Sequence, residues 1–199
     1  MIAAAALIGA FLAGSIPFGF LLGRLIYHTD IRKSGSGNIG TMNALRTLGA
    51  PGAVVVLLLD AGKGVLPTLI ATHLNGAAWL APSCAALAVL GHCYSPWLGW
   101  KGGKGVATSV GAIFALSWQA GLICVGAWLL GTLPTTYSSV GSMLANIAAP
   151  FALFFLTGSL ANTAYGIFVA FFIPYAHREN IERLRNGTES GISFLRRKT

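Results

Sequence analysis

The sequence contains few charged residues for its length. Asp, Glu, Lys and Arg make up 9% of the 199 residues, whereas soluble domains carry about a quarter. Hydrophobic residues make up 55%, and the mean hydropathy is +0.71. So little charge excludes a chain whose whole surface faces water, and we expect one all-α integral membrane domain over residues 1–199. The net charge of +8 then indicates cytoplasmic loops, anionic lipid or an anionic substrate, and not nucleic acid.

The sequence also lacks the patterns of metal and thiol chemistry. Cys84, Cys93 and Cys124 lie in or beside apolar runs without metal-ligand spacing, and we interpret them as small buried hydrophobic residues. The sequence has no His, Cys and Asp cluster with the spacing of a metal site, and no Gly-x-Ser-x-Gly nucleophile turn. We therefore expect no metal and no cofactor. An enzyme with this sequence would need a substrate that is already activated.

The charges that are present fall into clusters. These clusters lie at residues 24–46, 60–63, 101–104 and 178–198. A spanning helix needs about 20 apolar residues, and Lys and Arg favour the cytoplasmic side. If the large basic clusters all face the cytoplasm, an even number of spans must separate them. We therefore predict seven transmembrane helices, with the N-terminus outside and the C-terminus cytoplasmic, near residues 2–25, 51–73, 77–98, 104–117, 119–133, 138–157 and 159–178.

Parts of this topology have alternatives. The run at residues 2–25 could be a signal peptide, but it is too long and lacks a basic N-terminal region, so we interpret it as a retained span. Residues 104–133 could form a re-entrant hairpin, which would leave the tail on the same side.

Asp60 and Lys63 fall inside the second span, where charges are costly, and their spacing allows them to pair within the protein.

The first of three unusual segments on the predicted cytoplasmic side covers residues 32–46. Its glycines let the backbone aim several N–H groups at one point, and its Ser, Asn and Arg side chains add hydrogen-bond donors for an anion. A flexible loop is the alternative, and Gly and Ser alone would favour it. The candidate site residues of this segment are Ser36, Gly37, Asn38, Gly40, Asn43 and Arg46.

The second segment places a lysine among glycines where a span is predicted to begin. Lys104 follows Gly102 and Gly103 and precedes Gly105. A helix N-terminus, bare N–H groups and an ammonium group would together bind phosphate. The alternative is a lysine that anchors the helix at the lipid headgroups, which fits Lys101 better than Lys104.

The third segment begins at His177. On a helix, His177 and Asn180 lie one turn apart on the same face, and histidine can exchange a proton near neutral pH. A hydrated histidine at the membrane surface is the alternative. The hydroxyl-rich stretch 135–142, which includes Ser142, opens the sixth predicted span and either lines the same cavity or caps the helix.

With these segments in view, the chain resembles the bacterial membrane acyl-phosphate:glycerol-3-phosphate acyltransferases. The resemblance runs from Gly14 to Glu189 and is most specific at residues 35–46, 102–108 and 177–183. One stretch departs from the family. The usual Gly-Ala-Thr-Asn is replaced by Gly40-Thr41-Met42-Asn43, so the hydroxyl lies one residue earlier, about 100° around a helical turn. We keep Thr41 as a candidate and leave Met42 out.

The resemblance implies a multi-pass enzyme of the bacterial inner membrane with its active site on the cytoplasmic side. It would transfer a fatty acyl group from acyl phosphate to the 1-hydroxyl of glycerol 3-phosphate, giving 1-acylglycerol 3-phosphate and phosphate, the first acylation of phospholipid synthesis. Neither acyl-CoA nor a metal would take part. Lys104, His177 and Arg46 would be the catalytic residues, and these three with Ser142 and Asn180 would orient glycerol 3-phosphate. The proton acceptor is either His177 or the departing phosphate.

A small transporter or channel for an anionic solute is the rival interpretation. Such a protein would place polar groups along its spans from both faces. The outer half of this sequence offers mainly His73, Asn75, Gln119 and Asn162, all near predicted turns. This distribution favours the enzyme.

Overall fold

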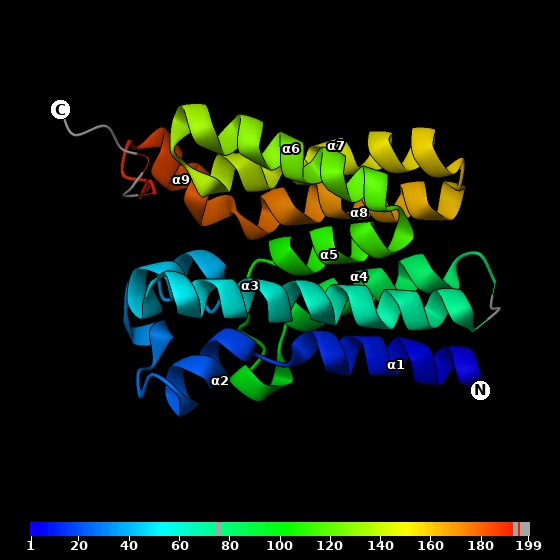
Figure 1. Ribbon diagram of the computed structural model, residues 1–199, viewed down its shortest axis with the longest axis horizontal. Helices are drawn as coiled ribbons and strands as arrows, with labels where there is room; N and C mark the ends of the chain where they lie inside the picture. Colours follow the sequence, from blue (N-terminus) through cyan, green and yellow to red (C-terminus); the bar gives the residue numbers. More distant parts are fainter. Residues whose placement is uncertain (75–76, 193–194, 196–199) are drawn as a thin grey trace.

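The computed structural model describes residues 1–74, 77–192 and 195. Every regular element in these residues is helical, which confirms the predicted all-α class (Figure 1). The predicted turn residues Asn75 and Gly76 and the basic tail 196–198 lie outside the described residues. The elements are α1 Ile2–Ser15, α2 Phe18–Leu25, η1 Ile31–Lys33, α3 Thr41–His73, α4 Leu80–Cys93, η2 Pro96–Leu98, α5 Val106–Leu116, α6 Trp118–Thr135, α7 Ser138–Thr157, α8 Leu160–Ala176 and α9 Arg178–Arg185.

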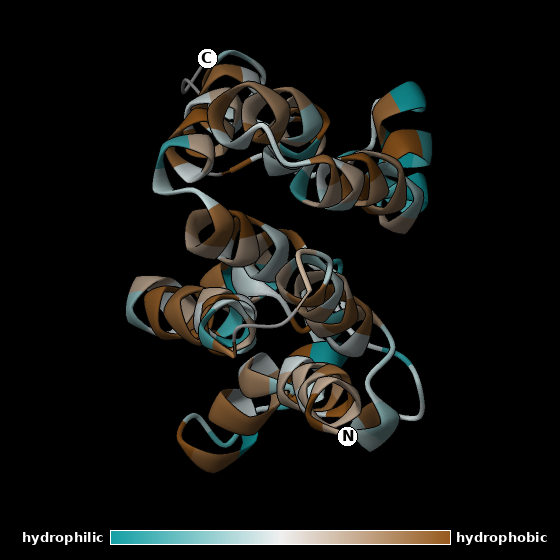
Figure 2. Ribbon diagram, turned by 90° about the vertical axis from the view of Figure 1, so that its right-hand side faces the viewer, coloured by the Kyte–Doolittle hydropathy of each residue, from teal (hydrophilic) through white to brown (hydrophobic). Residues whose placement is uncertain are grey.

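The outer surface of the helices is apolar. Large hydrophobic side chains such as Leu58, Phe155 and Phe171 are 65%, 78% and 77% exposed, and Figure 2 shows hydrophobic positions on the outer sides of the helix bundle. In the described residues, α3 and α7 are long and apolar enough to cross a membrane, and the bent pair α1 and α2 is a third candidate if it forms one span. Exposed apolar surface of this extent suits contact with lipid and not with water.

The first predicted span, residues 2–25, is broken into two helices. α1 and α2 meet at an angle of 43°, because Pro17 has no N–H group and pushes Ile16 into extended backbone geometry. The break frees carbonyl oxygens that a continuous helix would use. Ser95 Oγ donates to the Ser15 carbonyl at 2.7 Å, and Lys63 Nζ donates to the Ile16 carbonyl at 2.8 Å.

The third and fourth predicted spans are shorter than expected. α4 has 14 residues and α5 has 11, so α5 is about 16 Å long, well below the roughly 30 Å of a hydrocarbon core. Between them, the segment 94–105 is irregular except for η2 and doubles back midway along the bundle (Figure 1). Irregular backbone at this depth is tolerated only where protein or a water-filled cavity surrounds it, so this segment marks a place where a polar site can exist.

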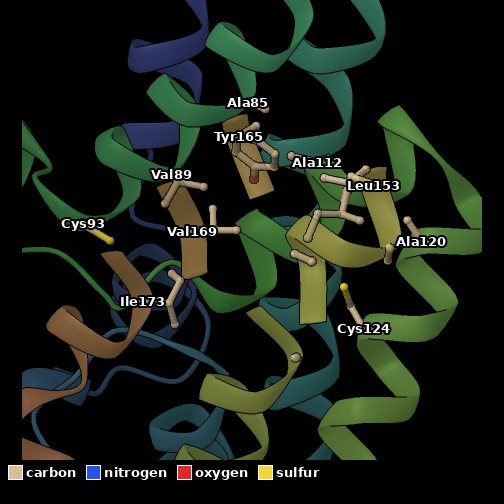
Figure 3. Packing of buried hydrophobic residues seen from close by; sticks show 14 residues of the cluster. Ala85, Val89, Cys93, Ala112, Ala120, Cys124, Leu153, Tyr165, Val169 and Ile173 are labelled. Atoms are coloured by element: carbon tan, nitrogen blue, oxygen red, sulfur yellow. The ribbon is translucent and has the colours of Figure 1, made fainter. Parts of the chain in front are cut away.

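The central core lies among α4, α5, α6, α7 and α8 (Figure 3). Leu153, Val169 and Ile173 are fully buried there. Small residues let neighbouring backbones approach closely. A Cβ atom at Gly64 of α3 would lie 2.9 Å from the carbonyl carbon of Thr108 in α5, so any larger residue would push these two helices apart. Contact between α3 and α5 in turn positions the segment that precedes α5.

Charge gathers at one end of the bundle. Figure 1 shows that η1, the start of α3, the turn between α6 and α7, and α9 all lie at that end. The helix ends at the opposite side, around residues 116–118 and 157–160, contain no Asp, Glu, Lys or Arg. The first and third segments selected from the sequence therefore lie at the same end of the bundle, and Lys104 of the second segment contacts the third at Asn180.

Candidate active site

A hydrogen-bonded chain of side chains joins the second and third segments. Lys104, two residues before α5, donates through its ammonium group to Oδ1 of Asn180 in α9. Asn180 Nδ2 donates to Oε1 of Glu189 at 2.6 Å. The structure thus brings Lys104 and Asn180 into direct contact across 76 positions of sequence.

Glu189 anchors this chain, although the sequence did not single it out as a site residue. Ser139 Oγ donates to its Oε1 at 2.8 Å, and Arg183 Nε donates to its Oε2 at 2.8 Å. Burial raises the pKa of Glu189, but hydrogen bonds from Asn180, Arg183 and Ser139 outweigh burial and leave the pKa below its usual 4.5. Glu189 therefore stays ionised at neutral pH. The sequence signal was one acidic residue, two positions after Gly187, in a basic tail.

Cations converge on this chain. Lys104 is half-buried, and burial together with nearby Arg183 and Arg46 lowers the pKa of its ammonium group. Arg46 Nη2 donates to the Ser190 carbonyl at 3.1 Å, next to Glu189. A dianionic phosphate bound here would offset this mutual repulsion, because charge-assisted bonds to phosphate are strong. The arrangement therefore suits an anion with several oxygen acceptors.

His177 lies at the junction of α8 and α9, outside both helices, with 4% of its surface exposed. Its Nδ1 is 2.8 Å from the Ile173 carbonyl. Only a protonated Nδ1 can donate there, so neutral His177 presents an unprotonated Nε2. Burial and the adjacent Lys104 lower the pKa of His177 to about 4. At neutral pH, His177 is therefore an uncharged hydrogen-bond acceptor, suited to orienting a hydroxyl group.

The first glycine segment is shaped by its asparagines. Asn43 Oδ1 accepts from the Ser36 N–H at 2.8 Å, and Asn43 Nδ2 donates to the Ile31 carbonyl at 2.7 Å. Asn38 Oδ1 accepts from the Gly40 N–H at 2.9 Å. The Gly37 N–H donates to the Ser34 carbonyl at 3.0 Å. Much of the hydrogen-bonding capacity that we expected to meet an anion is thus used to hold the loop.

Thr41 differs from these neighbours. Its Oγ1 is buried and, among the described residues, has no hydrogen-bond partner. Such a hydroxyl at the start of α3 costs free energy unless a ligand pairs with it.

The glycines before Lys104 also serve packing. The N–H groups of Gly102 and Gly103 donate to the carbonyls of Cys93 at 2.9 Å and His92 at 3.0 Å. We expected these N–H groups to be bare. They are occupied because the last carbonyls of α4 have no partner within their own helix. Of this segment's predicted groups, the ammonium of Lys104 reaches the third segment, where it bonds to Asn180.

Ser142 lies on α7 with 5% of its surface exposed. It follows Ser139, the Glu189 partner, by three residues, so both hydroxyl groups lie on the same side of α7. The Ser142 carbonyl accepts from Asn146 Nδ2 at 2.9 Å. The structure therefore places Ser142 beside the chain that holds Lys104, but one helical turn further along α7.

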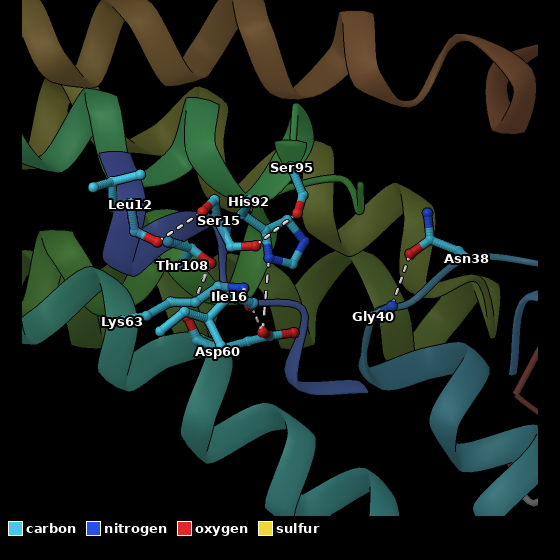
Figure 4. Close-up of polar contacts among 10 residues, drawn as sticks. All are labelled: Leu12, Ser15, Ile16, Asn38, Gly40, Asp60, Lys63, His92, Ser95 and Thr108. Atoms are coloured by element: carbon cyan, nitrogen blue, oxygen red, sulfur yellow. Dashed lines mark hydrogen bonds and ion pairs between the residues drawn. The ribbon is translucent and has the colours of Figure 1, made fainter. Parts of the chain in front are cut away.

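Asp60 and Lys63 form the predicted ion pair. Lys63 Nζ lies 2.8 Å from Asp60 Oδ1, and the Nδ1 of His92 lies 3.7 Å from the same oxygen (Figure 4). His92 was not expected to join them. Among the described residues, no group of three or more His, Cys, Asp and Glu side chains could hold a metal ion.

Comparison with known proteins agrees with this geometry. Residues 4–187 match the family model described as glycerol-3-phosphate acyltransferase. The glycerol-3-phosphate acyltransferase of Synechococcus sp. (strain JA-2-3B'a(2-13)) is 43% identical over 187 residues, which cover 94% of this chain and 93% of that protein. The enzyme of the same name from Zymomonas mobilis is 42% identical over 196 residues, covering 92% of each chain.

Solved structures resemble the whole fold. The crystal structure of PlsY, described as an integral membrane glycerol 3-phosphate acyltransferase in its glycerol 3-phosphate form, matches with a TM-score of 0.92 and 39% identity over 96% of each chain. Its lysophosphatidic acid form matches with a TM-score of 0.89 and 37% identity over 96% of each chain. The model match, the relatives and the fold agree, and this membrane protein belongs to the glycerol-3-phosphate acyltransferase family.

Proposed function

We propose that this chain transfers a fatty acyl group from acyl phosphate to the 1-hydroxyl of glycerol 3-phosphate. The products are 1-acylglycerol 3-phosphate and inorganic phosphate. The observation that carries the proposal is the convergence of Lys104, Arg46 and Arg183 on the chain formed by Asn180 and Glu189. Both substrates carry phosphate, and this is the set of groups that phosphate oxygens require.

The acyl phosphate donor explains what the sequence lacks. An acyl phosphate is a mixed anhydride, so its carbonyl carbon is already reactive and phosphate is a good leaving group. A direct transfer therefore needs neither a covalent nucleophile nor a metal. The hydroxyl oxygen of glycerol 3-phosphate would attack the acyl carbon, and the bond between that carbon and the phosphate oxygen would break.

The residues that remain available to substrate have roles in this transfer. Lys104 and Arg46 bind phosphate oxygens and stabilise negative charge that develops on the acyl oxygen and the leaving group. Asn180 holds the ammonium of Lys104 in place. Ser142 and Thr41 supply hydroxyl donors near the ends of α7 and α3. The first glycine segment, Ser36 to Gly40, faces the acyl phosphate head.

The proton of the attacking hydroxyl goes to the departing phosphate in this scheme. His177 accepts a hydrogen bond from the hydroxyl through Nε2 and orients it. Because the pKa of His177 is about 4, its imidazole is a weak base at neutral pH, whereas a phosphate dianion is a stronger base, since its conjugate acid titrates near neutrality. The transfer then balances, since the leaving phosphate departs with the proton that the hydroxyl gives up.

The membrane arrangement is part of the proposal. Seven spans, with the N-terminus outside and the C-terminus in the cytoplasm, would place the charged end of the bundle on the cytoplasmic side of a bacterial inner membrane. There, soluble glycerol 3-phosphate and a membrane-dissolved acyl phosphate can meet in a single domain. Labelling of single cysteines at Ser34 and Ser117 from intact cells tests this, because only the variant at Ser117 should react with an impermeant reagent.

The test of function uses purified protein with palmitoyl phosphate and glycerol 3-phosphate. We expect equal amounts of phosphate and 1-acylglycerol 3-phosphate, and neither product when glycerol 3-phosphate is omitted. Palmitoyl-CoA should not replace the acyl phosphate, because its leaving group is not a phosphate. Product formation from palmitoyl-CoA alone, or no product from acyl phosphate, would overturn the proposal. In the latter case, uptake of glycerol 3-phosphate into vesicles would test the transporter.

A further inference from the structure

A buried charged cluster lies in the bundle beside the segment that leads to Lys104. It consists of Asp60 and Lys63 from α3 and His92 from α4 (Figure 4). The three side chains are 2%, 3% and 4% exposed. Within the described residues, the ion pairs and hydrogen bonds of these side chains join them to each other and to the Ile16 carbonyl, and the transfer scheme gives the three side chains no direct role.

Stabilisation of the fold does not by itself explain why charged side chains are buried at this position. A buried ion pair loses the hydration of both charges, and well-packed apolar residues of similar volume are often as stable. Charged groups within membrane-spanning helices are costly in the same way, and they generally have a functional reason to be there. The contacts that the cluster makes with other elements indicate that reason.

The cluster attaches α3 to the break in the first helix pair and to the start of α5. Lys63 Nζ donates to the Ile16 carbonyl at 2.8 Å, at the point where Pro17 interrupts the helix. Thr108 Oγ1, in the first turn of α5, donates to the Asp60 carbonyl at 2.9 Å. One turn of α3 thus bonds both to the break between α1 and α2 and to α5, the helix that follows the irregular segment 94–105.

His92 attaches the same cluster to the irregular segment itself. The His92 carbonyl accepts from the Gly103 N–H, directly before Lys104. The imidazole ring fills the space over Gly103, because a Cβ atom there would lie 2.9 Å from both Cδ2 and Cε1 of the ring and closer still to Nε2. Ser95 and Trp97 of the segment bond to Ser15, at 2.7 Å to its carbonyl and 2.8 Å to its Oγ.

We propose that Asp60, Lys63 and His92 are positioning residues that fix the segment 94–105 and thereby hold Lys104 against α9. Asp60 keeps Lys63 aimed at the Ile16 carbonyl and faces the His92 ring, and the ring in turn packs on Gly103. The irregular segment is therefore fastened at Gly103, directly before its catalytic lysine. This inference rests on the proposed role of Lys104 in binding substrate phosphate.

The first measurement is amide hydrogen exchange over residues 94–105 in the purified protein, which does not depend on catalysis. We expect Asp60→Asn, Lys63→Met and His92→Ala to speed exchange of the Gly102 and Gly103 amides about tenfold or more, since each variant loosens the segment. Thr68→Val is the matched control. Thr68 is buried in the same helix, but its hydroxyl bonds only to its own helix at Gly64, so exchange should not change.

The second measurement is kcat and KM for glycerol 3-phosphate in the same variants, per folded protein. A misplacement of Lys104 of order 1 Å should lower kcat/KM by about tenfold to a hundredfold. His92→Asn should recover only part of this loss relative to His92→Ala, because its amide lies near the position of Nδ1, which faces Asp60, but leaves open the space over Gly103 that the ring fills. A role confined to stability would lower the amount of folded protein and leave kcat/KM unchanged.

Each outcome decides the inference. Unchanged exchange in Asp60→Asn and Lys63→Met would overturn it, and so would faster exchange with normal kcat/KM. If the single variants do not fold, Asp60→Asn with Lys63→Met removes both buried charges while still losing the bond to Ile16, and it should show the same faster exchange. If the proposed function is wrong, the wild type will show no acyl transfer, while the variants will still show the expected change in exchange. This result differs from every outcome that overturns the inference.

Discussion

Substitutions at Gly102 and Gly103 can show whether these glycines are needed for packing or for binding substrate. The atoms nearest to a methyl group at Gly103 would be those of the His92 imidazole, whereas one at Gly102 would lie 2.8 Å from the Cys93 carbonyl oxygen and closer still to the His92 carbonyl. Overpacking of this kind costs about 1–3 kcal/mol. We therefore expect Gly103→Ala to lower kcat/KM by roughly fivefold to 150-fold if the strain falls on the segment that holds Lys104.

Removal of the His92 ring should also remove the loss of kcat/KM that Gly103→Ala causes. In a His92→Ala background, Gly103→Ala should cause little further loss, which corresponds to a coupling free energy of about 0.5–3 kcal/mol. Gly102→Ala is the matched control. Its added methyl group would meet main-chain carbonyl groups, which His92→Ala leaves in place, so its loss of kcat/KM should be the same in both backgrounds. The assay is acyl transfer from palmitoyl phosphate, with thermal unfolding measured in parallel. Equal costs of Gly103→Ala in both backgrounds would refute the reasoning and assign Gly103 to the substrate instead.

Two further predictions concern titratable groups. Because the folded-state pKa of Glu189 lies below its usual 4.5, its ionised form stabilises the fold above that pH, and the stabilisation is lost as the pH falls through the folded pKa. Glu189→Gln should therefore lower Tm at pH 7 and weaken its dependence on pH below 5; an unchanged Tm profile would contradict this. His177→Gln should keep most of kcat, because Gln can still accept a hydrogen bond, while His177→Ala loses it; equal loss in both would make His177 the base.

The sequence located helices best where apolar runs end at polar breaks. The sixth span was predicted at residues 138–157 and is α7, Ser138–Thr157. The fifth, predicted at 119–133, is α6, Trp118–Thr135. Here hydrophobicity and local turn residues determine the boundaries, and both are visible in the sequence.

Boundaries that depend on tertiary contacts were less accessible. α3 is Thr41–His73, but Gly49 (φ 78°) is non-helical and divides it. The part after this break begins close to the predicted residue 51, whereas the additional helical part before it, from Thr41, was not predicted. α4 ends at Cys93, five residues before the predicted end at 98. Its last carbonyls bond to N–H groups of the returning chain, and no local pattern reveals such a partner.

In the site too, contacts within one helix could be predicted from the sequence, whereas contacts between distant elements could not. Asp60 and Lys63 could be paired from the sequence because three residues on a helix bring them together. The contact from His92 to Asp60 depends on how α4 packs against α3, and the position of Glu189 depends on Ser139, 50 residues away. The motifs identified which residue types meet, and the packing decides which of them bond to each other and which remain for a substrate.

Binding of glycerol 3-phosphate to Lys104→Met and Lys101→Met tests the central claim most directly. Both lysines lie in the same segment and carry the same charge, but Lys101 is exposed and Lys104 is half-buried against Asn180. Titration calorimetry should show wild-type affinity for Lys101→Met and a loss of about tenfold or more for Lys104→Met, as expected when one charge-assisted contact to phosphate is removed. Equal affinities of the two variants would contradict the claim that Lys104 binds substrate phosphate.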